Sequence, residues 1–368
     1  MTKTFALGDT LTSERLAKGH LTLLRENDRT SGFAEVDAAF RHDVVKGLSI
    51  EPRTVPARWL YDRRGSELFE AITALPEYYP TRIESSILSH AASEVAALTG
   101  QQRVIVEFGS GSSAKTPILL SEVSPAAYVP IDISGEFLKE SAATVSAAFP
   151  DLPIFPVEGD FAAALALPDA VSGMPRLGFF PGSTIGNLVI PDAVDLLRVM
   201  AATLGSGSML LIGVDRIKDT EILLRAYDDA QGVTAAFNLN LLDRINRELA
   251  GSVPVDAFRH VVRWNDAEAR IEMHLEAASD VHFSVSGRHF SMAKGETIHT
   301  ENSLKYGLSE ARLLLRAGGW TPIADWTDRN EFFSLILAKG VTPSAPRPLR
   351  QTGNLRNYGT PSDLTLDR

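Results

Sequence analysis

The residues best suited to chemistry in this chain form the stretch EFGSGSSAKT at 107–116, directly after the apolar run RVIV. A strand that leads into a glycine-rich turn exposes backbone N–H groups, which commonly bind a phosphate or lie close to a ribose. Three kinds of site fit this pattern: a nucleotide-binding P-loop, a dinucleotide site, and the cofactor loop of a methyltransferase. Other residues must decide among them.

The P-loop pattern G-x-x-x-x-G-K-S/T is matched from Gly109 to Thr116 except at one position, where Ala114 replaces the second glycine. That glycine lets the loop turn tightly around a phosphate, and a methyl group obstructs the turn. We also find no apolar strand that ends in an aspartate suited to hold Mg²⁺ for such a site. The sequence therefore argues against a P-loop.

The dinucleotide pattern G-x-G-x-x-G/A is matched by Gly109, Gly111 and Ala114, and Asp132 follows about twenty residues later, where it could bind a ribose hydroxyl. The same geometry suits S-adenosylmethionine, because the glycines admit the amino acid part of that cofactor and the acid can bind both ribose hydroxyls. The loop alone therefore leaves a nicotinamide cofactor and S-adenosylmethionine as alternatives.

The elements that must position this loop are short apolar runs, each ending in a polar or glycine-bearing turn: VIVEF, AYVPIDI, PIFPVEGDF, RLGFFPGSTIGNL and SMLLIGVD. Helical stretches fill most of the gaps, which predicts a parallel, doubly wound α/β sheet with ligands at the carboxyl ends of its strands. After Asp215 a long helical stretch and antiparallel-type strands predict an inserted second domain. WTPIADWTD and FFSLILAKG then resume the sheet as a hairpin of sixth and seventh strands.

Two features favour a methyltransferase over a nicotinamide enzyme. Asp160 ends the third apolar run, where it could hydrogen-bond an adenine amino group while Phe161 stacks nearby. An aspartate at such a strand-to-helix turn is about as often a helix N-cap as a ligand-binding residue, so the N-cap stays an alternative. The closing hairpin is the second feature, because it is typical of methyltransferases and not of the dinucleotide-binding fold.

Composition limits the class of protein. The 36 basic and 46 acidic residues give a net charge of −10, which repels polyanions, and no basic stripe opposes it. No run of about 18 apolar residues or secretory signal is present, so we expect a cytoplasmic protein that contacts neither membrane nor nucleic acid. The absence of cysteine excludes disulfides and thiolate chemistry. No H-x-x-x-H or H-E-x-x-H spacing occurs, so we expect no metal.

Six motifs follow one another along the chain: YDRRGSELFEAITALPEYYPTRIE, VEFGSGSSAKT, FFPGSTIGN, RAYDDAQGVTAAFN, RIEM and TENSLKY. In this order they resemble the L-histidine Nα-methyltransferases of ergothioneine biosynthesis, from about Val45 to about Ala338. The resemblance implies a Rossmann-like, seven-stranded class I methyltransferase core at 83–217 and 306–340. It also implies an inserted α+β substrate-binding domain at 25–82 and 218–305. The segment 341–368 is rich in proline, glycine and polar residues, which predicts a flexible tail.

The resemblance also assigns residues. S-adenosylmethionine would lie against Gly109, Lys115, Asp132, Asp160 and Phe161, with Lys115 at its carboxylate end. L-histidine would be bound by Tyr78, Gly182, Asn187 and Tyr227, with Glu301 and Ser303 on its imidazole, Met273 lining the imidazole pocket, and Tyr61 close to the amine. Tyr61 and Asn187 are the expected catalytic residues. Taken alone, Asn187 is also typical of a turn and Glu301 of a solvated surface acid.

The implied activity is trimethylation of the α-amino group of L-histidine to hercynine. Methyl transfer from a sulfonium to a neutral amine needs little acid or base help, so positioning should dominate catalysis. Water or a tyrosine hydroxyl could accept the ammonium proton, and Tyr61 and Tyr78 could stabilise the methylated cation through cation–π contact. The alternatives are a related enzyme acting on tryptophan or another amino acid, a non-catalytic regulator, and a nicotinamide oxidoreductase. Nothing predicts a coiled coil or swapped strand, so we expect a monomer.

Overall fold

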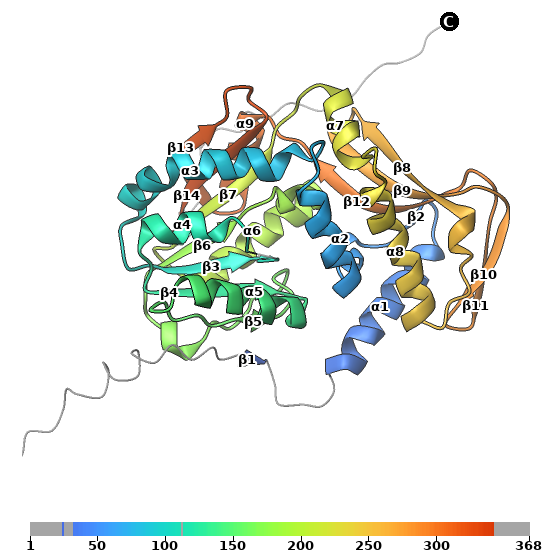
Figure 1. Ribbon diagram of the computed structural model, residues 1–368, viewed down its shortest axis with the longest axis horizontal. Coiled ribbons are helices and arrows are strands. Elements are labelled where there is room, and N and C mark those ends of the chain that lie inside the picture. The colour runs from blue at the N-terminus through green and yellow to red at the C-terminus, as the bar shows by residue number, and fades with distance from the viewer. Residues whose placement is uncertain (1–23, 26–31, 112, 342–368) are drawn as a thin grey trace, which may run out of the picture.

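The computed structural model describes residues 24–25, 32–111 and 113–341, so nearly all of the predicted tail at 341–368 lies outside the described residues. The described residues form an eight-stranded and a four-stranded sheet that lie side by side, each with its own helices, and a separate two-stranded hairpin (Figure 1). Among the described residues, no helix combines the length and the apolar character needed to cross a membrane.

The larger sheet has eight strands in the order β1-β5-β4-β3-β6-β7-β14-β13. In that order they are β1 (Leu24–Arg25), β5 (Val157–Glu158), β4 (Ala127–Asp132), β3 (Val104–Phe108), β6 (Arg176–Phe180), β7 (Met209–Asp215), β14 (Phe333–Gly340) and β13 (Trp320–Thr327). All are parallel except β14, which is antiparallel to both of its neighbours. All seven predicted strands are present in a Rossmann-like class I methyltransferase order.

The eighth strand of this sheet, β1, was not predicted. It pairs in parallel with β5, so that Arg25 lies beside Glu158. Arg25 therefore lies at the edge of the larger sheet, although the sequence placed it in the segment 25–82 of the second domain.

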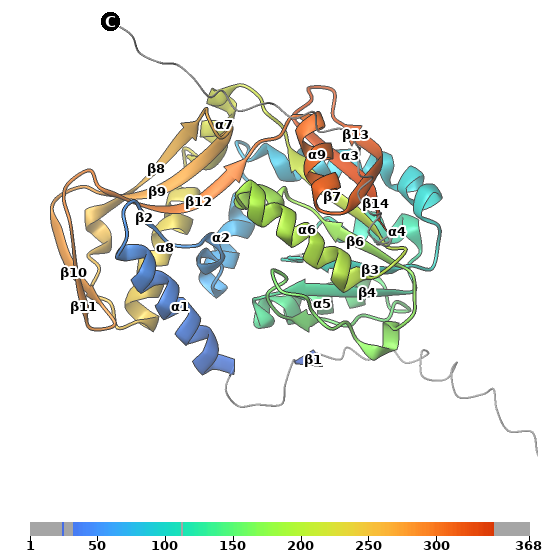
Figure 2. The same ribbon diagram turned by 180° about the vertical axis from the view of Figure 1, so that it is seen from behind.

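Helices cover both faces of the larger sheet, which is why its strands are nearly continuous apolar runs. One face carries α3 (Tyr79–Thr99), α4 (Thr116–Val123) and α5 (Gly135–Ala148), and the other carries α6 (Ile190–Leu204) and α9 (Leu308–Ala317) (Figures 1 and 2). The alternation of side chains along β3 follows this layering. Val104 and Val106 pack toward α6 and α9, whereas Ile105 packs toward α3 and α4.

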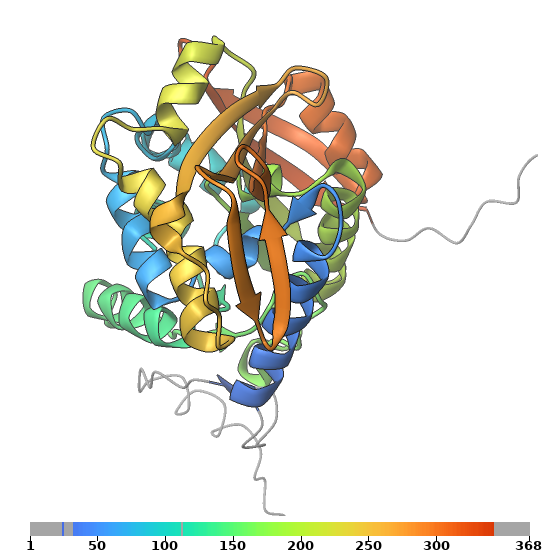
Figure 3. The same ribbon diagram turned by 90° about the vertical axis from the view of Figure 1, so that its right-hand side faces the viewer.

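The smaller sheet has four strands in the order β2-β12-β9-β8, with a separate hairpin of β10 and β11. These strands are β2 (Arg53–Thr54), β12 (Thr297–Leu304), β9 (Arg270–Ala277), β8 (Phe258–Asn265), β10 (Val281–Val285) and β11 (Arg288–Met292). The helices of this part are α1 (Gly32–Leu48), η1 (Ala57–Leu60), α2 (Arg63–Thr73), α7 (Thr220–Tyr227), α8 (Val233–Glu248) and η4 (Val255–Ala257). In Figure 3, α1 (blue) and α8 (yellow) lie on either side of the orange strands. The antiparallel strands predicted after Asp215 are thus present.

The two sheets meet where β7 and β12 end. The backbone N–H of Tyr306 donates to the carbonyl oxygen of Asp215 at 2.9 Å. The short helix η3 (Thr184–Asn187), which follows β6, packs against the end of β12 so closely that a Cβ on Gly186 would lie 2.8 Å from the carbonyl oxygen of Leu304. The remaining short helix is η2 (Asp169–Val171). This junction brings the carboxyl ends of the core strands up to β12.

Substitution of Leu211 tests how tightly the buried sheet is packed. It is 0% exposed on β7, whereas Leu313 on α9 is 67% exposed. We expect Leu211→Ala to lower the free energy of unfolding by about 2 to 5 kcal/mol, because a cavity replaces the side chain. The matched variant Leu313→Ala should change it by less than about 0.5 kcal/mol. Urea denaturation of both variants measures the difference, and equal losses would contradict this packing.

Candidate functional site

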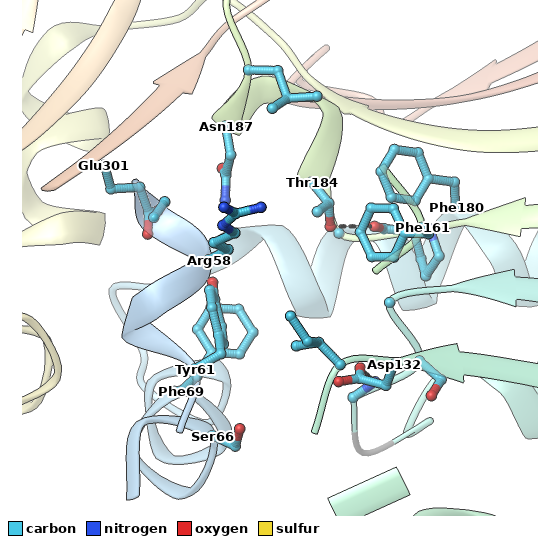
Figure 4. Close-up of a pocket in the computed structure, with 18 of the residues that line it drawn as sticks. Arg58, Tyr61, Ser66, Phe69, Asp132, Phe161, Phe180, Thr184, Asn187 and Glu301 are labelled. Carbon is cyan, nitrogen blue, oxygen red and sulfur yellow. Dashed lines mark hydrogen bonds between the residues drawn. The ribbon is translucent and has the colours of Figure 1, made fainter. Parts of the chain in front are cut away.

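A cavity of about 560 Å³ lies at the carboxyl ends of the core strands and is closed on its other side by η1, α2 and β12. A volume of this size suits a small-molecule ligand. The predicted site residues that line it are Tyr61, Tyr78, Gly109, Lys115, Asp132, Asp160, Phe161, Gly182, Asn187 and Glu301. Figure 4 shows Glu301, Asn187 and Tyr61 on one side and Asp132 and Phe161 on the other.

The glycine-rich loop turns sharply at the end of β3. Gly109 has a φ of 70°, a conformation that side chains disfavour, and a Cβ there would lie 3.3 Å from the ring of Phe161. The backbone N–H groups of Gly109 and Ser110 both donate to the carbonyl oxygen of Ile131, at 2.9 and 3.0 Å. The loop is therefore fixed against the neighbouring strand β4 with its backbone open to the cavity.

Asp132 ends β4 beneath this loop. One carboxylate oxygen accepts from the N–H of Gly111 and the other from the N–H of Ser134, both at 2.9 Å. Burial raises the pKa of this carboxyl, and the two backbone hydrogen bonds oppose the shift. Each oxygen keeps a further lone pair, so Asp132 can still accept hydrogen bonds from two adjacent ligand hydroxyls, such as those of a ribose.

Asp160 has a partner that the sequence did not predict. Its carboxylate accepts from Arg58 at 3.1 Å and from the N–H of Ala162 at 2.9 Å. Arg58 belongs to η1 and also pairs with Asp43 at 2.6 Å. This ion pair joins the two parts of the molecule across the cavity. No helix begins directly after Asp160, whose bond to Ala162 closes a turn, so the helix N-cap that the sequence left as an alternative is wrong.

Phe161 lines the cavity beside Asp160. Its ring meets those of Phe108 and Phe180 edge to face, with centroids 6.4 and 5.8 Å apart. Such edge-to-face packing fixes the ring orientation. The exposed part of Phe161 can therefore contact a flat group such as an adenine.

Lys115 lines the cavity, and its ammonium pairs with the carboxylate of Glu84, a fully buried residue of α3. The same carboxylate accepts from the N–H of Gly182 at 2.9 Å. Gly182 thus has only its carbonyl left for a ligand. Sequence reasoning missed Glu84, although an indication existed: it lies on the apolar face of its helix, in line with Ile87 and Leu88.

Glu107, in the motif at the end of β3, is a second buried acid that the sequence analysis passed over. It accepts from Thr116 at 2.7 Å and from Tyr128 at 2.5 Å. Burial raises the pKa of Glu107 to about 7, although both hydrogen bonds and the charge of Lys115 oppose the shift. A carboxyl and an ammonium thus line the same end of the cavity.

Aromatic side chains form the other end. The ring of Tyr61 meets Phe69 at 5.5 Å and Phe237 at 5.4 Å, and the ring of Tyr78 meets Tyr227 at 6.3 Å. Burial raises the pKa of both Tyr61 and Tyr78 well above its ordinary value. Their phenols therefore stay neutral near pH 7, which favours water over a tyrosine hydroxyl among the two proton acceptors that the sequence left open.

A bulge in β12 positions Glu301. His299 pairs with His274 and Glu301 with Met273, so Thr300 is one extra residue. The hydroxyl of Thr300 donates to the amide oxygen of Asn238 at 2.7 Å, and this buried side chain of α8 fixes the bulge. Because residues directly opposite share a face, Glu301 lies on the side of Met273 and not on that of His274.

The carboxylate of Glu301 is incompletely hydrogen-bonded. Its Oε2 atom is buried and has no hydrogen-bond partner. Burial raises the pKa of this carboxyl to about 7, and the charge of Lys305 opposes the shift. A buried acceptor without a partner is costly, so the site is suited to a ligand that brings an N–H donor.

Three predicted residues are not among those that line the cavity. Tyr227 and Ser303 lie just behind it, with their hydroxyl oxygens 2.6 Å apart, and the buried Met273 lies opposite Glu301. Lys305, which the sequence analysis did not single out, donates to both hydroxyls. In the part of the chain that the structure describes, no three histidine or acidic side chains are grouped as metal ligands.

Comparisons with known proteins agree with this geometry. The model of a family described as histidine-specific methyltransferase, SAM-dependent, matches residues 40–340. Histidine N-alpha-methyltransferase of Mycolicibacterium smegmatis is 42% identical over 306 residues, which are 82% of this chain and 94% of that protein. The protein of the same name from Mycobacterium tuberculosis has the same identity and coverage. Ergothioneine biosynthesis protein 1 of Neurospora crassa is 30% identical over 78% of this chain and 33% of its own length.

The raised pKa of Glu301 predicts a pH-dependent stability. A folded-state pKa of about 7 against an ordinary 4.5 means that the native state binds the proton more tightly, so stability falls as pH rises through this window. Glu301→Gln removes this loss, and its stability relative to wild type should rise by up to about 3 kcal/mol between about pH 5 and pH 8. Urea denaturation at both pH values measures this difference.

The control for this experiment is Glu331→Gln, because the Glu331 side chain is 77% exposed. We expect the stability of this variant to follow that of wild type at both pH values. A Glu301→Gln curve that also follows wild type would contradict the burial of an unpaired carboxyl.

Proposed function

The chain belongs to the family of histidine-specific, S-adenosylmethionine-dependent methyltransferases, and we propose that it methylates the α-amino group of L-histidine three times to give hercynine for ergothioneine biosynthesis. One observation carries the choice of substrate. Glu301 places a buried, unpartnered carboxylate oxygen in the same cavity as the glycine-rich loop. An imidazole N–H is the complementary donor, and a charge-assisted hydrogen bond there is stronger than a neutral one.

The larger sheet binds the cofactor in this proposal, through residues 83–217 and 306–340. S-adenosylmethionine supplies a methyl group that is already activated on a sulfonium. Asp132 accepts from the ribose hydroxyls, and the open backbone at Gly109 leaves room for the amino acid part. Lys115 binds the carboxylate with the donors that Glu84 leaves free, while Asp160 and Phe161 contact the adenine.

The segments 25–82 and 218–305 form the substrate-binding domain in this proposal. Asn187 and the carbonyl of Gly182 bind the amino acid end, because the N–H of Gly182 is already used by Glu84. Tyr78, which directly precedes α3, closes the site, and Tyr227 at the end of α7 packs behind it. Ser303 and Met273 support the imidazole beside Glu301, and Tyr61 lies close to the amine. Since both cavity tyrosines remain neutral, we assign the ammonium proton to water and the catalytic effect to positioning.

Retention of the partly methylated amine also follows from these rings. Each transfer brings the nitrogen closer to a fixed positive charge, and the faces of Tyr61 and Tyr78 favour such a cation by about 0.5 to 2 kcal/mol. We further infer a cytoplasmic monomer whose partner is free L-histidine, without nucleic acid, membrane or metal. The net charge of −10 supports the exclusion of nucleic acid.

Incubation with labelled S-adenosylmethionine and a panel of amino acids tests the activity directly. We expect mass spectrometry to detect the mono-, di- and trimethyl forms of L-histidine. We expect little product from tryptophan, because its indole ring has one N–H group and cannot hydrogen-bond both Glu301 and Ser303. Conversion of tryptophan in place of histidine would overturn the proposed substrate. Cofactor binding without any turnover would indicate a regulator.

Replacement of Glu301 by alanine separates substrate binding from cofactor binding. We expect Glu301→Ala to raise the KM for histidine roughly tenfold or more, because a buried charge-assisted hydrogen bond is lost. The Kd for S-adenosylmethionine should stay within about twofold of wild type, since Glu301 lies on the opposite side of the cavity from Asp132. Steady-state kinetics and calorimetry measure the two constants. Glu331→Ala serves as the exposed control, and an unchanged KM in Glu301→Ala would remove this residue from the site.

A further inference from the structure

Lys305 is a buried cation directly behind the cavity. Its side chain is 0% exposed, and its Nζ atom donates to Asp215 Oδ2 at 2.7 Å, to Ser303 Oγ at 2.7 Å and to the hydroxyl of Tyr227 at 2.9 Å. An ammonium has three hydrogens and no acceptor, so all of its hydrogen-bonding capacity is used. Both hydroxyl oxygens therefore receive a hydrogen bond from Lys305.

The two hydroxyls then have a single proton to spare. Their oxygens are 2.6 Å apart, so one hydroxyl donates to the other. The receiving oxygen already accepts from Lys305, so its two acceptor positions are filled and its own proton must point elsewhere. Whichever of the two receives, the Tyr227–Ser303 pair keeps one hydroxyl proton free to donate to a ligand. A ligand group at this point must be an acceptor.

The charge behind the pair is incompletely neutralised. The buried carboxylate of Asp215 lies between Lys305 and Lys218, and it also accepts from the hydroxyl of Tyr79 at 2.8 Å. Burial alone raises the pKa of Asp215, yet the two lysines hold it below its ordinary value. Asp328 acts on Lys218 only from beyond contact distance. Two cations thus share one contacting anion, which favours an anionic ligand nearby.

The positive charge of Lys305 acts on the cavity. Glu301, Ser303 and Lys305 alternate along β12 and its continuation, so they project to one side. The charge of Lys305 opposes the rise in the pKa of Glu301, so its field reaches a residue that lines the cavity. The end of β12 also packs against η3, which ends at Asn187. The strand that carries Glu301 and Ser303 thus lies against the short helix that carries Asn187.

We propose that Lys305 is a positioning residue for substrate selection: it turns the Tyr227–Ser303 pair into a donor backed by buried positive charge, and this donor binds the α-carboxylate of a free amino acid. The site then discriminates against imidazoles that lack the carboxylate, such as L-histidinol, in which a hydroxymethyl group replaces it. This inference rests on the proposed function and assigns a further residue to the same site.

The test compares L-histidine with L-histidinol as methyl acceptors. In wild type we expect kcat/KM to be at least about tenfold higher for histidine, a ratio in the range of a charge-assisted hydrogen bond. In Lys305→Met the ratio should fall to about twofold or less, mainly through the KM for histidine, while the Kd for S-adenosylmethionine is unchanged. The matched control is Lys294→Met, because Lys294 is an exposed lysine of the same domain. It should keep the wild-type ratio.

Asp215→Asn is a second variant, which changes the net charge of the buried cluster in the opposite direction. It disrupts the same ion pair but adds positive charge, whereas Lys305→Met removes it. We expect the ratio of histidine to histidinol to be kept or raised in Asp215→Asn. A purely structural role predicts that both variants lose the ratio together, and this result would overturn the inference. An unchanged ratio in Lys305→Met would also overturn it.

The two proposals fail differently. A wild-type enzyme that does not methylate histidine counts against the proposed function, whereas one that methylates histidine and histidinol equally counts against the inference alone. If Lys305→Met does not fold, Asp215→Asn still decides, since a loss of the ratio there contradicts a charge-directed donor.

Discussion

The two halves of the cavity are joined at one buried residue, Asp215 at the carboxyl end of β7, through both its side chain and its backbone. Lys305 reaches it from the end of β12, Tyr79 from the first turn of α3, and Lys218 from the chain that leads into the second part of the molecule. The backbone N–H of Tyr306 adds a hydrogen bond to its carbonyl oxygen. The cofactor-side groups stand on the larger sheet and Glu301 on the smaller one. This joint therefore sets the distance between the two halves of the site.

Buried carboxyl groups around this joint have pKa values shifted in opposite directions. Burial raises the pKa of Asp215, but the charges of the two lysines lower it by more, so the net shift is downward. The carboxylate therefore stays ionised and holds the two sheets together. Glu107 and Glu301 are also buried, but their hydrogen-bond and charged partners do not offset the loss of water, so burial raises the pKa of each to about 7. Surroundings therefore decide which acids hold the structure together and which can change protonation with a ligand.

The predictability of this protein from sequence follows the same division. The core strands and the glycine-rich loop were predictable because buried parallel strands and tight turns leave local patterns. The partners of the predicted residues were not. Lys115 pairs with Glu84, 31 residues away, and Asp160 with Arg58, 102 residues away, and such pairings depend on tertiary packing alone. Lys305 left a weak trace, since Ser303 and Lys305 alternate with Leu304 and Tyr306 where β12 ends.

The extra residue in β12 has a consequence for how such pockets diverge. Glu301 lies opposite Met273 because Thr300 is looped out before it. An otherwise identical strand with its extra residue one position later would place Thr300 opposite Met273 and turn the carboxylate away. A hydroxyl would then replace an acid without any change in composition. Selectivity at the Glu301 side of the cavity is therefore encoded in the register of β12 against β9. Small insertions or deletions can alter this selectivity as effectively as point substitutions.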